Sequence, residues 1–465
     1  MIRDFIDREK EQEVLKREWN SDGGRLIIIY GRRRVGKTRL VNEFIKGKEG
    51  IMFFAEDVTV QIQINGLKAE IAGYLNDELL QGLTIKSWTE LFTYLMKNPP
   101  DKRSYLIIDE FTYLIRSDKS ILSAIQKAWD RGLSDSLWCI ILSGSLLNLM
   151  SEYALSYTSP LYGRRTRDML LKPLEFKDAK LFLSQNEKDS LKTYFTTGGV
   201  PEYLQKASEY ETYEEFVRNE FFSNFGYFYR EPYFLLSQEF RELKTYQGIL
   251  SAIAEGKTKP SDIAVNCGID TRKIYPYLDG LIRLGFIEKE TPLLSSQKSG
   301  IYIIKDSVID FWYSFVSPNR NEIERGCYTN YDFNKYFGKK FESFVRNEIA
   351  PAIFPKARTG RWWHKGEEID LIAVDDDAET IIFAEVKYGK KSASDALKIL
   401  NKLEQKSEYV KNSTKNSTKN NEDYTKKYAL FAGKITDKDK ITDRDKIKGD
   451  NYLIYDLDDM MKYLM

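Results

Sequence analysis

Residues 25–38 read RLIIIYGRRRVGKT, and this stretch decides the fold of the N-terminal part of the chain. The apolar run at 25–30 predicts a strand that is buried on both faces of a parallel sheet. Residues 31–38 fit the pattern G-x-x-x-x-G-K-S/T, and TRLVNEFIK from Thr38 onward favours a helix. Glycines allow backbone N–H groups to surround a phosphate, and a helix N-terminus adds a favourable dipole. The stretch therefore predicts a strand, a phosphate-binding loop and a helix in direct succession.

The side chains of this loop have separate expected roles. Lys37 should reach the terminal phosphates of a nucleotide, and the Thr38 hydroxyl should hold Mg²⁺. We interpret the three arginines as facing the surface or a partner, because backbone amides bind the phosphates in such a loop. We assign the whole loop to nucleotide binding: Gly31, Arg32, Arg33, Arg34, Val35, Gly36, Lys37 and Thr38.

Polar residues follow two later apolar stretches, YLIID and LWCIILS. After the first, we expect Asp109 to hold Mg²⁺ through water and Glu110 to polarise the water that attacks the terminal phosphate. After the second, Ser143 or Ser145 would sense that phosphate. The alternative for the two serines is an ordinary turn at the end of a strand.

Three arginines lie together in LYGRRTRDM. A guanidinium near the terminal phosphate stabilises the charge of the transition state, so Arg164 and Arg165 are candidate catalytic residues, with Arg167 beside them. The alternative is a solvated charged turn. The pattern does not decide whether such an arginine acts in its own chain or in a neighbouring copy.

Strands and helices alternate through residues 1–170, which predicts an α/β fold with a parallel sheet. The expected strands lie at 25–30, 51–55, 105–109 and 137–143. The expected helices between them lie at 39–46, 63–76, 88–96 and 121–129. From residue 171 to about 238 the strand pattern disappears, and aromatic and helical residues dominate.

Composition excludes several classes of protein and site. The 465 residues carry 71 Lys+Arg, 70 Asp+Glu and one His, so the chain is not a globally basic nucleic-acid coat protein. His364 alone cannot build a histidine-ligated zinc site, and Cys139, Cys267 and Cys327 are scattered and odd in number, which suits a reducing cytoplasm. No apolar run approaches the roughly 20 residues that cross a bilayer, and the charged N-terminus is not a signal peptide, so we expect no membrane partner.

Six motifs together resemble the prokaryotic archaeal-type ATPases of the broader AAA+/STAND group of P-loop ATPases. They are GRRRVGKT, IDRE (6–9), LIIDEF (106–111), LSGS (142–145), LYGR (161–164) and TGGVPEYL (197–204). The resemblance covers about residues 1–300 and implies a P-loop NTPase core at 1–170, a helical lid at 171–238 and ATP with Mg²⁺ as cofactors. It also implies that Arg8 and Glu9 lie near the adenine and that the turn at 198–201 belongs to the lid. A homo-oligomer is required only if one of the candidate arginines acts on a neighbouring copy.

Residues 239–305 read as three helices followed by two strands, the order of a winged helix. Pro260 begins a helix, Gly268 lies in the turn and Asp270 is the expected cap of the third helix, in which Pro276 removes a hydrogen bond. Basic residues that would contact DNA phosphates or bases are Arg272, Lys273 and Arg283. Residues 240–290 hold 8 Lys+Arg and 7 Asp+Glu, a net charge of only +1. DNA contact and a structural or protein-docking role therefore both stay open.

After a linker at 306–331, residues 332–465 form a second α/β unit. Asp370 lies on one expected strand, and Glu385 and Lys387 share a face of the next. Two carboxylates and a lysine are the elements of a Mg²⁺-dependent phosphodiesterase: Asp370 and Glu385 bind metal, Lys387 is catalytic, and Glu342 supplies a further ligand. The alternative is a solvated surface ion pair.

The second unit resembles the PD-(D/E)xK restriction-endonuclease superfamily over about residues 332–456, with the order helix, three strands, helix, strand. Residues 387–427 hold 11 Lys+Arg and 5 Asp+Glu, a net +6 beside the motif. The polar repeat at 411–427 predicts a mobile loop, and His364 is an expected strand-edge residue. The whole sequence thus predicts a cytoplasmic Mg²⁺-dependent ATPase that acts on DNA. The alternative is a STAND-type nucleotide-controlled switch that binds protein partners and carries an inactive nuclease-like domain.

Overall fold

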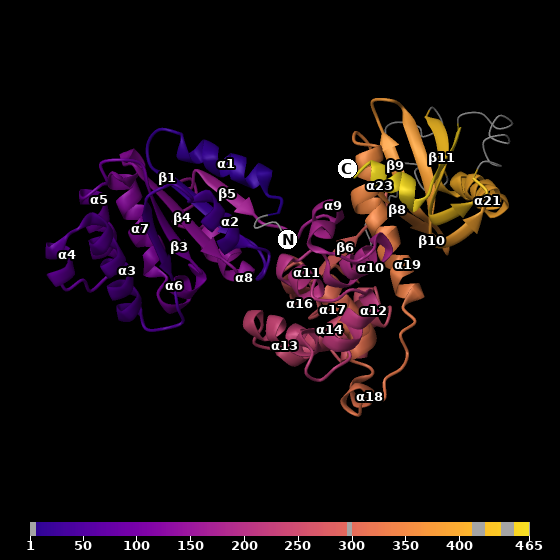
Figure 1. The fold of residues 1–465 in the computed structure, drawn as a ribbon, viewed down its shortest axis with the longest axis horizontal. Helices are drawn as coiled ribbons and strands as arrows, with labels where there is room; N and C mark the ends of the chain where they lie inside the picture. Colours follow the sequence, from indigo (N-terminus) through magenta and orange to yellow (C-terminus); the bar gives the residue numbers. More distant parts are fainter. Residues whose placement is uncertain (1–5, 295–299, 412–423, 439–450, 465) are drawn as a thin grey trace.

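The computed structural model describes residues 6–294, 300–411, 424–438 and 451–464. Figure 1 shows an N-terminal domain built on one sheet, a central helical region and a C-terminal domain built on a second sheet. Among the described residues, no helix has the length and apolar character needed to cross a membrane.

The N-terminal domain contains a five-stranded sheet in the order β2-β3-β4-β1-β5, and every neighbouring pair is parallel. Its strands are β1 (Arg25–Tyr30), β2 (Gly50–Phe54), β3 (Ser104–Asp109), β4 (Trp138–Gly144) and β5 (Arg167–Leu170). The four strands expected from the sequence are confirmed to within one residue at either end. The fifth was missed, because β5 is an edge strand whose residues, apart from Met169, are exposed, so it has no apolar run.

Helices cover both faces of this sheet (Figure 1). They are α1 (Glu9–Trp19), α2 (Lys37–Phe44), α3 (Val60–Leu75), α4 (Glu78–Gly82), α5 (Trp88–Lys97), α6 (Thr112–Ser117), α7 (Ser120–Arg131) and α8 (Leu147–Leu149). One core cluster packs α3, α5 and α7 against the sheet, and a second packs α1 and α2 against its other face. The domain is therefore a three-layer α/β fold with the phosphate-binding loop at the carboxyl end of β1, as the sequence predicted.

The following segment is helical, as expected, and contains α9 (Phe176–Ala179), α10 (Glu187–Thr197), α11 (Pro201–Ala207), α12 (Tyr213–Glu220) and α13 (Tyr227–Glu239). After it come α14 (Leu243–Ala254), α15 (Pro260–Cys267), α16 (Tyr275–Arg283) and the antiparallel hairpin of β6 (Ile287–Glu290) and β7 (Ile301–Ile304). The expected order of three helices and two strands is thus confirmed.

Two details of that prediction were wrong. Pro276 lies in the first turn of α16, where its missing N–H has no intrahelical acceptor to lose, so it does not weaken the helix. Asp270 does not cap α16, which begins only at Tyr275; its carboxylate accepts a hydrogen bond from the Arg272 N–H in the preceding turn.

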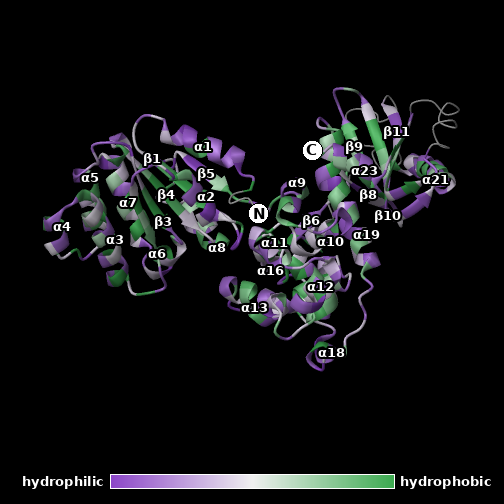
Figure 2. Cartoon of the chain, viewed as in Figure 1, coloured by the Kyte–Doolittle hydropathy of each residue, from purple (hydrophilic) through white to green (hydrophobic). Residues whose placement is uncertain are grey.

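The segment treated as a linker contains α17 (Ser307–Phe311) and α18 (Arg320–Glu324). Val308, Ile309 and Phe311 are fully buried. They belong to an aromatic-rich core that the helical region shares with one face of the C-terminal sheet. In Figure 2 the apolar residues follow the strands of the sheets and the inner faces of these helices.

The C-terminal domain contains α19 (Asn334–Phe344), α20 (Ala350–Ile353), α21 (Ala393–Lys411), α23 (Leu457–Lys462) and five strands in the order β12-β11-β10-β9-β8. The strands are β8 (Arg358–His364), β9 (Glu367–Asp375), β10 (Thr380–Ser392), β11 (Thr425–Thr436) and β12 (Tyr452–Tyr455). The β8–β9–β10 pairs are antiparallel, whereas β10–β11–β12 are parallel.

The expected order of helix, three strands, helix and strand is present here, with β12 and α23 added after it. Most of the expected mobile loop, 412–423, lies outside the described residues. Its predicted end was too late, because residues 425–427 already belong to β11.

Candidate nucleotide site and carboxylate–lysine cluster

The phosphate-binding loop has a backbone that its sequence explains. Gly36 has φ 91°, a conformation that side chains other than hydrogen make costly, and it is the residue before α2. A Cβ on Gly31 would lie 2.5 Å from the Leu171 carbonyl oxygen, so only glycine fits there. Arg34 also has a positive φ, 71°. The loop is thus held in a tight turn at the end of β1.

Lys37 is buried at the start of α2, and its Nζ donates hydrogen bonds to the carbonyl oxygens of Gly31 at 3.0 Å and Arg32 at 2.9 Å. Burial lowers the pKa of Lys37 to about 8, although the carboxylates of Glu110 and Asp109 act in the opposite direction. The ammonium group therefore lies inside the loop and would gain from an anionic ligand there.

The two carboxylates at the end of β3 are held by hydroxyl groups. The Thr38 hydroxyl donates to Asp109 Oδ2 and the Ser143 hydroxyl to Asp109 Oδ1, each at 2.6 Å. The Ser145 hydroxyl donates to Glu110 Oε2, also at 2.6 Å. In this structure the two serines therefore position the carboxylates, a role that the sequence analysis did not assign to them.

A cavity of about 520 Å³ adjoins the loop. Arg8 lines it and donates hydrogen bonds to the carbonyl oxygens of Val35 at 3.3 Å and Lys172 at 2.6 Å, whereas the exposed Glu9 is not among the lining residues. Pro201, from the turn before α11, lines the cavity together with Glu110. The helical region therefore forms one wall of the candidate nucleotide site.

The loop arginines were expected to face the surface or a partner, and for two of them the structure shows ion pairs within the chain instead. Arg32 forms an ion pair with Asp306 and lies over the Phe286 ring at 5.4 Å from its centroid. Arg34 pairs with Glu231 at 3.1 Å and with Glu202 at 3.3 Å. These carboxylates belong to the helical region, so the loop is bound to other parts of its own chain.

Sequence reasoning missed the acidic partners of the loop. Asp306 and Glu231 are each almost fully buried, and the Tyr203 hydroxyl donates to Glu231 at 2.6 Å. Burial raises the pKa of Glu239, at the end of α13, to about 7, and the cations that oppose this shift include Arg33, Arg32 and Lys37. No local pattern marks these acids, because each is far from the loop in the sequence.

The arginines after α8 do not lie at this cavity. Arg164 forms a two-pronged ion pair with Asp130, with both N–O distances 2.8 Å. Arg165 pairs with Asp168 at 2.9 Å, and Arg167 pairs with Glu18. The arginines among the described residues that line the cavity are instead Arg8, Arg33, Arg34 and Arg39.

In the C-terminal domain, Asp370 on β9 and Glu385 and Lys387 on β10 are brought together as predicted. Lys387 Nζ lies 3.0 Å from Glu385 Oε1 and 3.3 Å from Asp370 Oδ2, which also accepts the Val386 N–H at 2.9 Å. Lys406 on α21 lies 3.7 Å from Glu385 Oε1. Glu385 Oε2 is buried without a hydrogen-bond partner.

Glu342, on α19, is close enough to interact electrostatically with this cluster. Its own burial, and then the charge of Asp370, raise the pKa of Glu342 to about 7. Within the described parts of the chain, no three His, Cys, Asp or Glu side chains are gathered to hold a metal ion. Lys387 lies between the two carboxylates instead. His364 ends β8 beside Trp362, as expected of a strand-edge residue.

The β6–β7 hairpin is docked on this cluster. Arg346 donates to Glu290 Oε1 on β6 at 2.9 Å and to the Asp370 carbonyl oxygen at 3.4 Å. Arg361 also pairs with Glu290, at 3.2 Å. By contrast, the three basic residues around α16 are exposed: Arg272, Lys273 and Arg283.

Comparisons with known proteins show the family to which the chain belongs. Residues 5–207 match the family described as an ATPase domain predominantly from Archaea. The uncharacterized protein MJECL04 of Methanocaldococcus jannaschii is 34% identical over 468 residues, which cover 98% of this chain and 99% of that protein. The chain belongs to this archaeal ATPase family. Residues 312–399 of this archaeal ATPase also match a family described as "Archaea bacterial proteins of unknown function".

The solved structures that match this chain include two proteins from Pyrococcus. The Walker-type ATPase PABY2304 of Pyrococcus abyssi is 22% identical, covers 66% of this archaeal ATPase and 96% of its own chain, and has a TM-score of 0.49. A STAND protein with a tetratricopeptide repeat sensor from Pyrococcus horikoshii is 16% identical and has a TM-score of 0.32. The match covers 76% of this archaeal ATPase and 51% of the Pyrococcus chain.

Proposed function

We propose that the protein binds ATP with Mg²⁺ in the cavity beside the loop and hydrolyses it. The observation that carries the proposal is the convergence of Lys37, Thr38 and Asp109, with Thr38 and Asp109 joined by a 2.6 Å hydrogen bond. A hydroxyl and a carboxylate are the hard oxygen donors that Mg²⁺ prefers. Such sites use one or two protein oxygens and complete the shell with water and phosphates, so a cluster of three carboxylates is not needed.

The residues divide the work as follows. Backbone N–H groups of the loop and Lys37 bind the phosphates, and Thr38 and Asp109 would hold the metal ion, which neutralises charge on the phosphate oxygens. Glu110 accepts a hydrogen bond from the attacking water and orients it. Ser145 fixes the Glu110 carboxylate, and Ser143 fixes that of Asp109.

Steady-state release of phosphate from ATP tests the proposal: turnover should require Mg²⁺ and stop in EDTA, and turnover that persists in EDTA would contradict it.

Affinity for ATP should fall as pH rises through about 8. The pKa of Lys37 in the free protein is about 8 because of its burial. Bound phosphates favour the charged ammonium, so above that pH binding must first protonate the lysine. We expect the dissociation constant, measured by calorimetry, to rise about fivefold between pH 8 and pH 9. Lys37→Arg is the matched control, because a guanidinium stays charged; an equal pH dependence in that variant would assign the titration to another group.

A second function, metal-dependent cleavage of DNA, is favoured by the cluster of Asp370, Glu385 and Lys387. The buried, unpaired Glu385 Oε2 is an oxygen that a cation could use. We propose that Asp370 and Glu385 hold Mg²⁺, that Glu342 reaches the ion through water, and that Lys387 stabilises the phosphorane charge. The order of helix, three strands, helix and strand supports a nuclease-like domain, and α14–α16 with the β6–β7 hairpin support a winged helix.

Plasmid incubated with Mg²⁺ or Mn²⁺ tests the cleavage proposal. We expect wild type to nick or linearise the plasmid. The cleavage rate of Lys387→Ala should be lower by a factor of about 100 or more. Lys406→Ala is the matched control on the same cluster. Equal cutting by wild type and Lys387→Ala would remove the role of Lys387, and no cutting by either would leave a domain without this activity.

A nucleotide-controlled switch is the alternative function, and the ion pairs between the loop arginines and the helical region favour it. In that case α16 and the turn before it, with the exposed Arg272 and Lys273, contact DNA or a protein when the nucleotide state changes. Arg164 and Arg165 are distant from their own chain's cavity, so a catalytic role for them requires a homo-oligomer in which they reach a neighbouring copy.

A further inference from the structure

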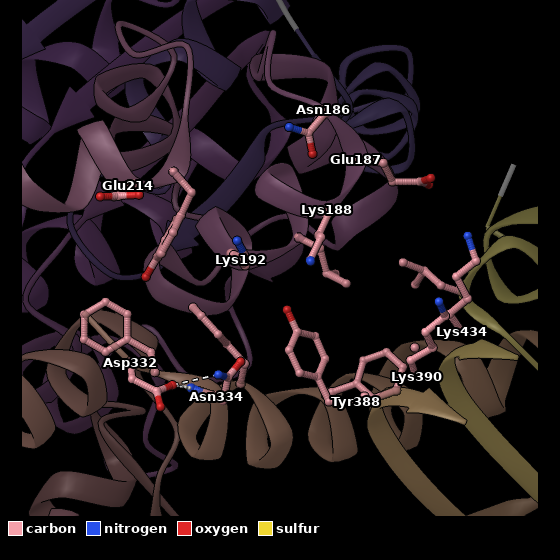
Figure 3. Close-up of a pocket in the computed structure, with 18 of the residues that line it drawn as sticks. Asn186, Glu187, Lys188, Lys192, Glu214, Asp332, Asn334, Tyr388, Lys390 and Lys434 are labelled. Atoms are coloured by element: carbon pink, nitrogen blue, oxygen red, sulfur yellow. Dashed lines mark hydrogen bonds between the residues drawn. The ribbon is translucent and has the colours of Figure 1, made fainter. Parts of the chain in front are cut away.

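A second cavity, of about 770 Å³, lies between the helical region and the C-terminal domain. Figure 3 shows that its walls come from α10 and α12 on one side and from α19 and the ends of β10 and β11 on the other. Lys390 and Lys434 lie along one wall, and the Tyr388 hydroxyl points into the space toward Lys188 (Figure 3). Nothing described above uses this cavity.

An irregularity in the sheet places the two lysines side by side. The β10–β11 register shifts between Lys387 and Lys390, so that Tyr388 and Gly389 together lie opposite Gly433. A Cβ on Gly433 would lie 1.9 Å from the Tyr388 carbonyl oxygen, so this bulge requires glycine. Directly after it, Lys390 is the register partner of Lys434. Like charges paired across strands destabilise a sheet unless an anion lies between them.

Some of the charged side chains that line the cavity have ion-pair or hydrogen-bond partners, and others do not. Among the described residues, Lys390, Lys434 and Lys188 form no ion pair. Three of the five lining carboxylates have partners: Asp456 binds Lys438, Glu214 binds Arg218, and the Asn334 amide donates to Asp332. The two others are Glu187, whose carboxylate lies at the rim of the cavity in Figure 3, and Asp458. Within the described parts of the chain, Lys188, Lys390 and Lys434 are therefore lining cations that have no ion-pair partner.

The floor of the cavity is aromatic. Tyr388 is half-buried, with its ring centroid 5.6 Å from that of Phe341 and 5.9 Å from that of Phe337 on α19. Burial raises the pKa of Tyr388 to about 12, so its hydroxyl remains a hydrogen-bond donor near neutral pH. A flat apolar surface next to unpaired cations suits a ligand that carries both a base and a phosphate.

We propose that this cavity binds single-stranded nucleic acid, with a phosphate between Lys390 and Lys434 and a base against Tyr388. The inference rests on the proposed action on DNA and adds the form of the substrate and the path it takes. Lys390 follows Lys387 on β10, roughly 10 Å along it at about 3.3 Å per residue, so the cavity and the proposed cleavage cluster share this β-strand, with Tyr388 and Lys387 on its opposite faces. Lys188, on α10, contacts the bound nucleic acid from the side of the helical region. The ligand would therefore connect the helical region with the C-terminal domain.

Fluorescence anisotropy with a labelled oligothymidylate and the full-length protein tests the proposal. We expect Lys390→Ala/Lys434→Ala to weaken binding by at least about tenfold and to lower the slope of log K against log salt by about 0.7, the value for the one phosphate contact that the two lysines share. Tyr388→Ala should weaken binding by about tenfold, whereas Tyr388→Phe, which keeps the ring, should stay within about threefold of wild type. Lys10→Ala/Lys16→Ala, on the distant and exposed face of α1, is the charge-matched control.

The outcomes separate this proposal from the functions on which it depends. If unlabelled AMP displaces the labelled oligonucleotide at concentrations similar to those of unlabelled oligonucleotide, the cavity is a mononucleotide site. That result would overturn the proposal that it binds single-stranded nucleic acid. Equal affinity and equal salt slope in the lysine variant and wild type would overturn the cavity assignment while leaving DNA action to be judged by plasmid cleavage. A wild-type protein that binds no oligonucleotide would also overturn it, and ATP turnover by the same preparation would show independently whether the ATPase proposal stands.

Discussion

Glu110→Gln is expected to bind ATP as tightly as wild type and to hydrolyse it about 10²–10⁴-fold more slowly, the range that a lost general base produces. Glu110 follows β3 directly and has a left-handed backbone conformation, φ 52°, beside the buried Asp109. Its carboxylate lines the nucleotide cavity and accepts the Ser145 hydroxyl. Glutamine keeps the size and the Oε acceptor, so binding should survive while the proton acceptor for water is lost.

Single-turnover hydrolysis and calorimetric ATP binding, measured on the same preparation, check this prediction. Glu70→Gln, on the exposed side of α3, is the matched control and should turn over like wild type. Unchanged hydrolysis by Glu110→Gln would remove its catalytic role. Loss of ATP binding as well would mean that Glu110 supports the cavity instead of the chemistry.

Asp306→Ala is expected to lower the free energy of unfolding by about 3–5 kcal/mol, because it leaves the Arg32 guanidinium largely buried without its counter-charge. The side chains of Arg32 and Asp306 are only 16% and 2% exposed. Asp306 Oδ1 also accepts the Ile309 N–H at 2.7 Å and so caps α17. The ion pair joins the loop to the helical region. Without it, the N-terminal domain and the helical region should unfold in two distinct transitions.

Urea denaturation followed by fluorescence measures this effect. Asp306→Asn keeps an oxygen that can cap α17 and removes the charge, so it separates the ion pair from the cap. The double variant Arg32→Met/Asp306→Leu removes both charges together and should recover much of the lost stability. A change below about 0.5 kcal/mol in Asp306→Ala, the size of an ordinary surface substitution, would contradict a structural role for this pair.

The sequence was sufficient where the deciding pattern is local. The run from Arg25 to Thr38 specifies a strand, a turn that requires Gly36, and a helix, and the structure contains all three. Alternation along β10 likewise placed Glu385 and Lys387 on one face, where they now meet Asp370.

The sequence was insufficient where a side chain is defined by a distant partner. Arg32 looks solvated in GRRRVGKT, and only the fold brings Asp306 to it. The motif around Arg164 suggests a catalytic arginine, yet its guanidinium pairs with Asp130 on α7 and does not line the cavity. Strand β5 was missed for a related reason, since an edge strand with Arg167 and Asp168 exposed has no apolar signature.

Calorimetric titration of the protein with ATP in the presence of Mg²⁺, for wild type and Lys37→Ala, is the most direct test of the central claim that this cavity is a nucleotide site. We expect saturable binding of one ATP per chain for wild type and affinity about 10- to 100-fold weaker for Lys37→Ala, the loss expected for charge-assisted hydrogen bonds to phosphate. Absence of Mg²⁺-dependent binding by wild type, or equal affinity in the two proteins, would contradict the claim.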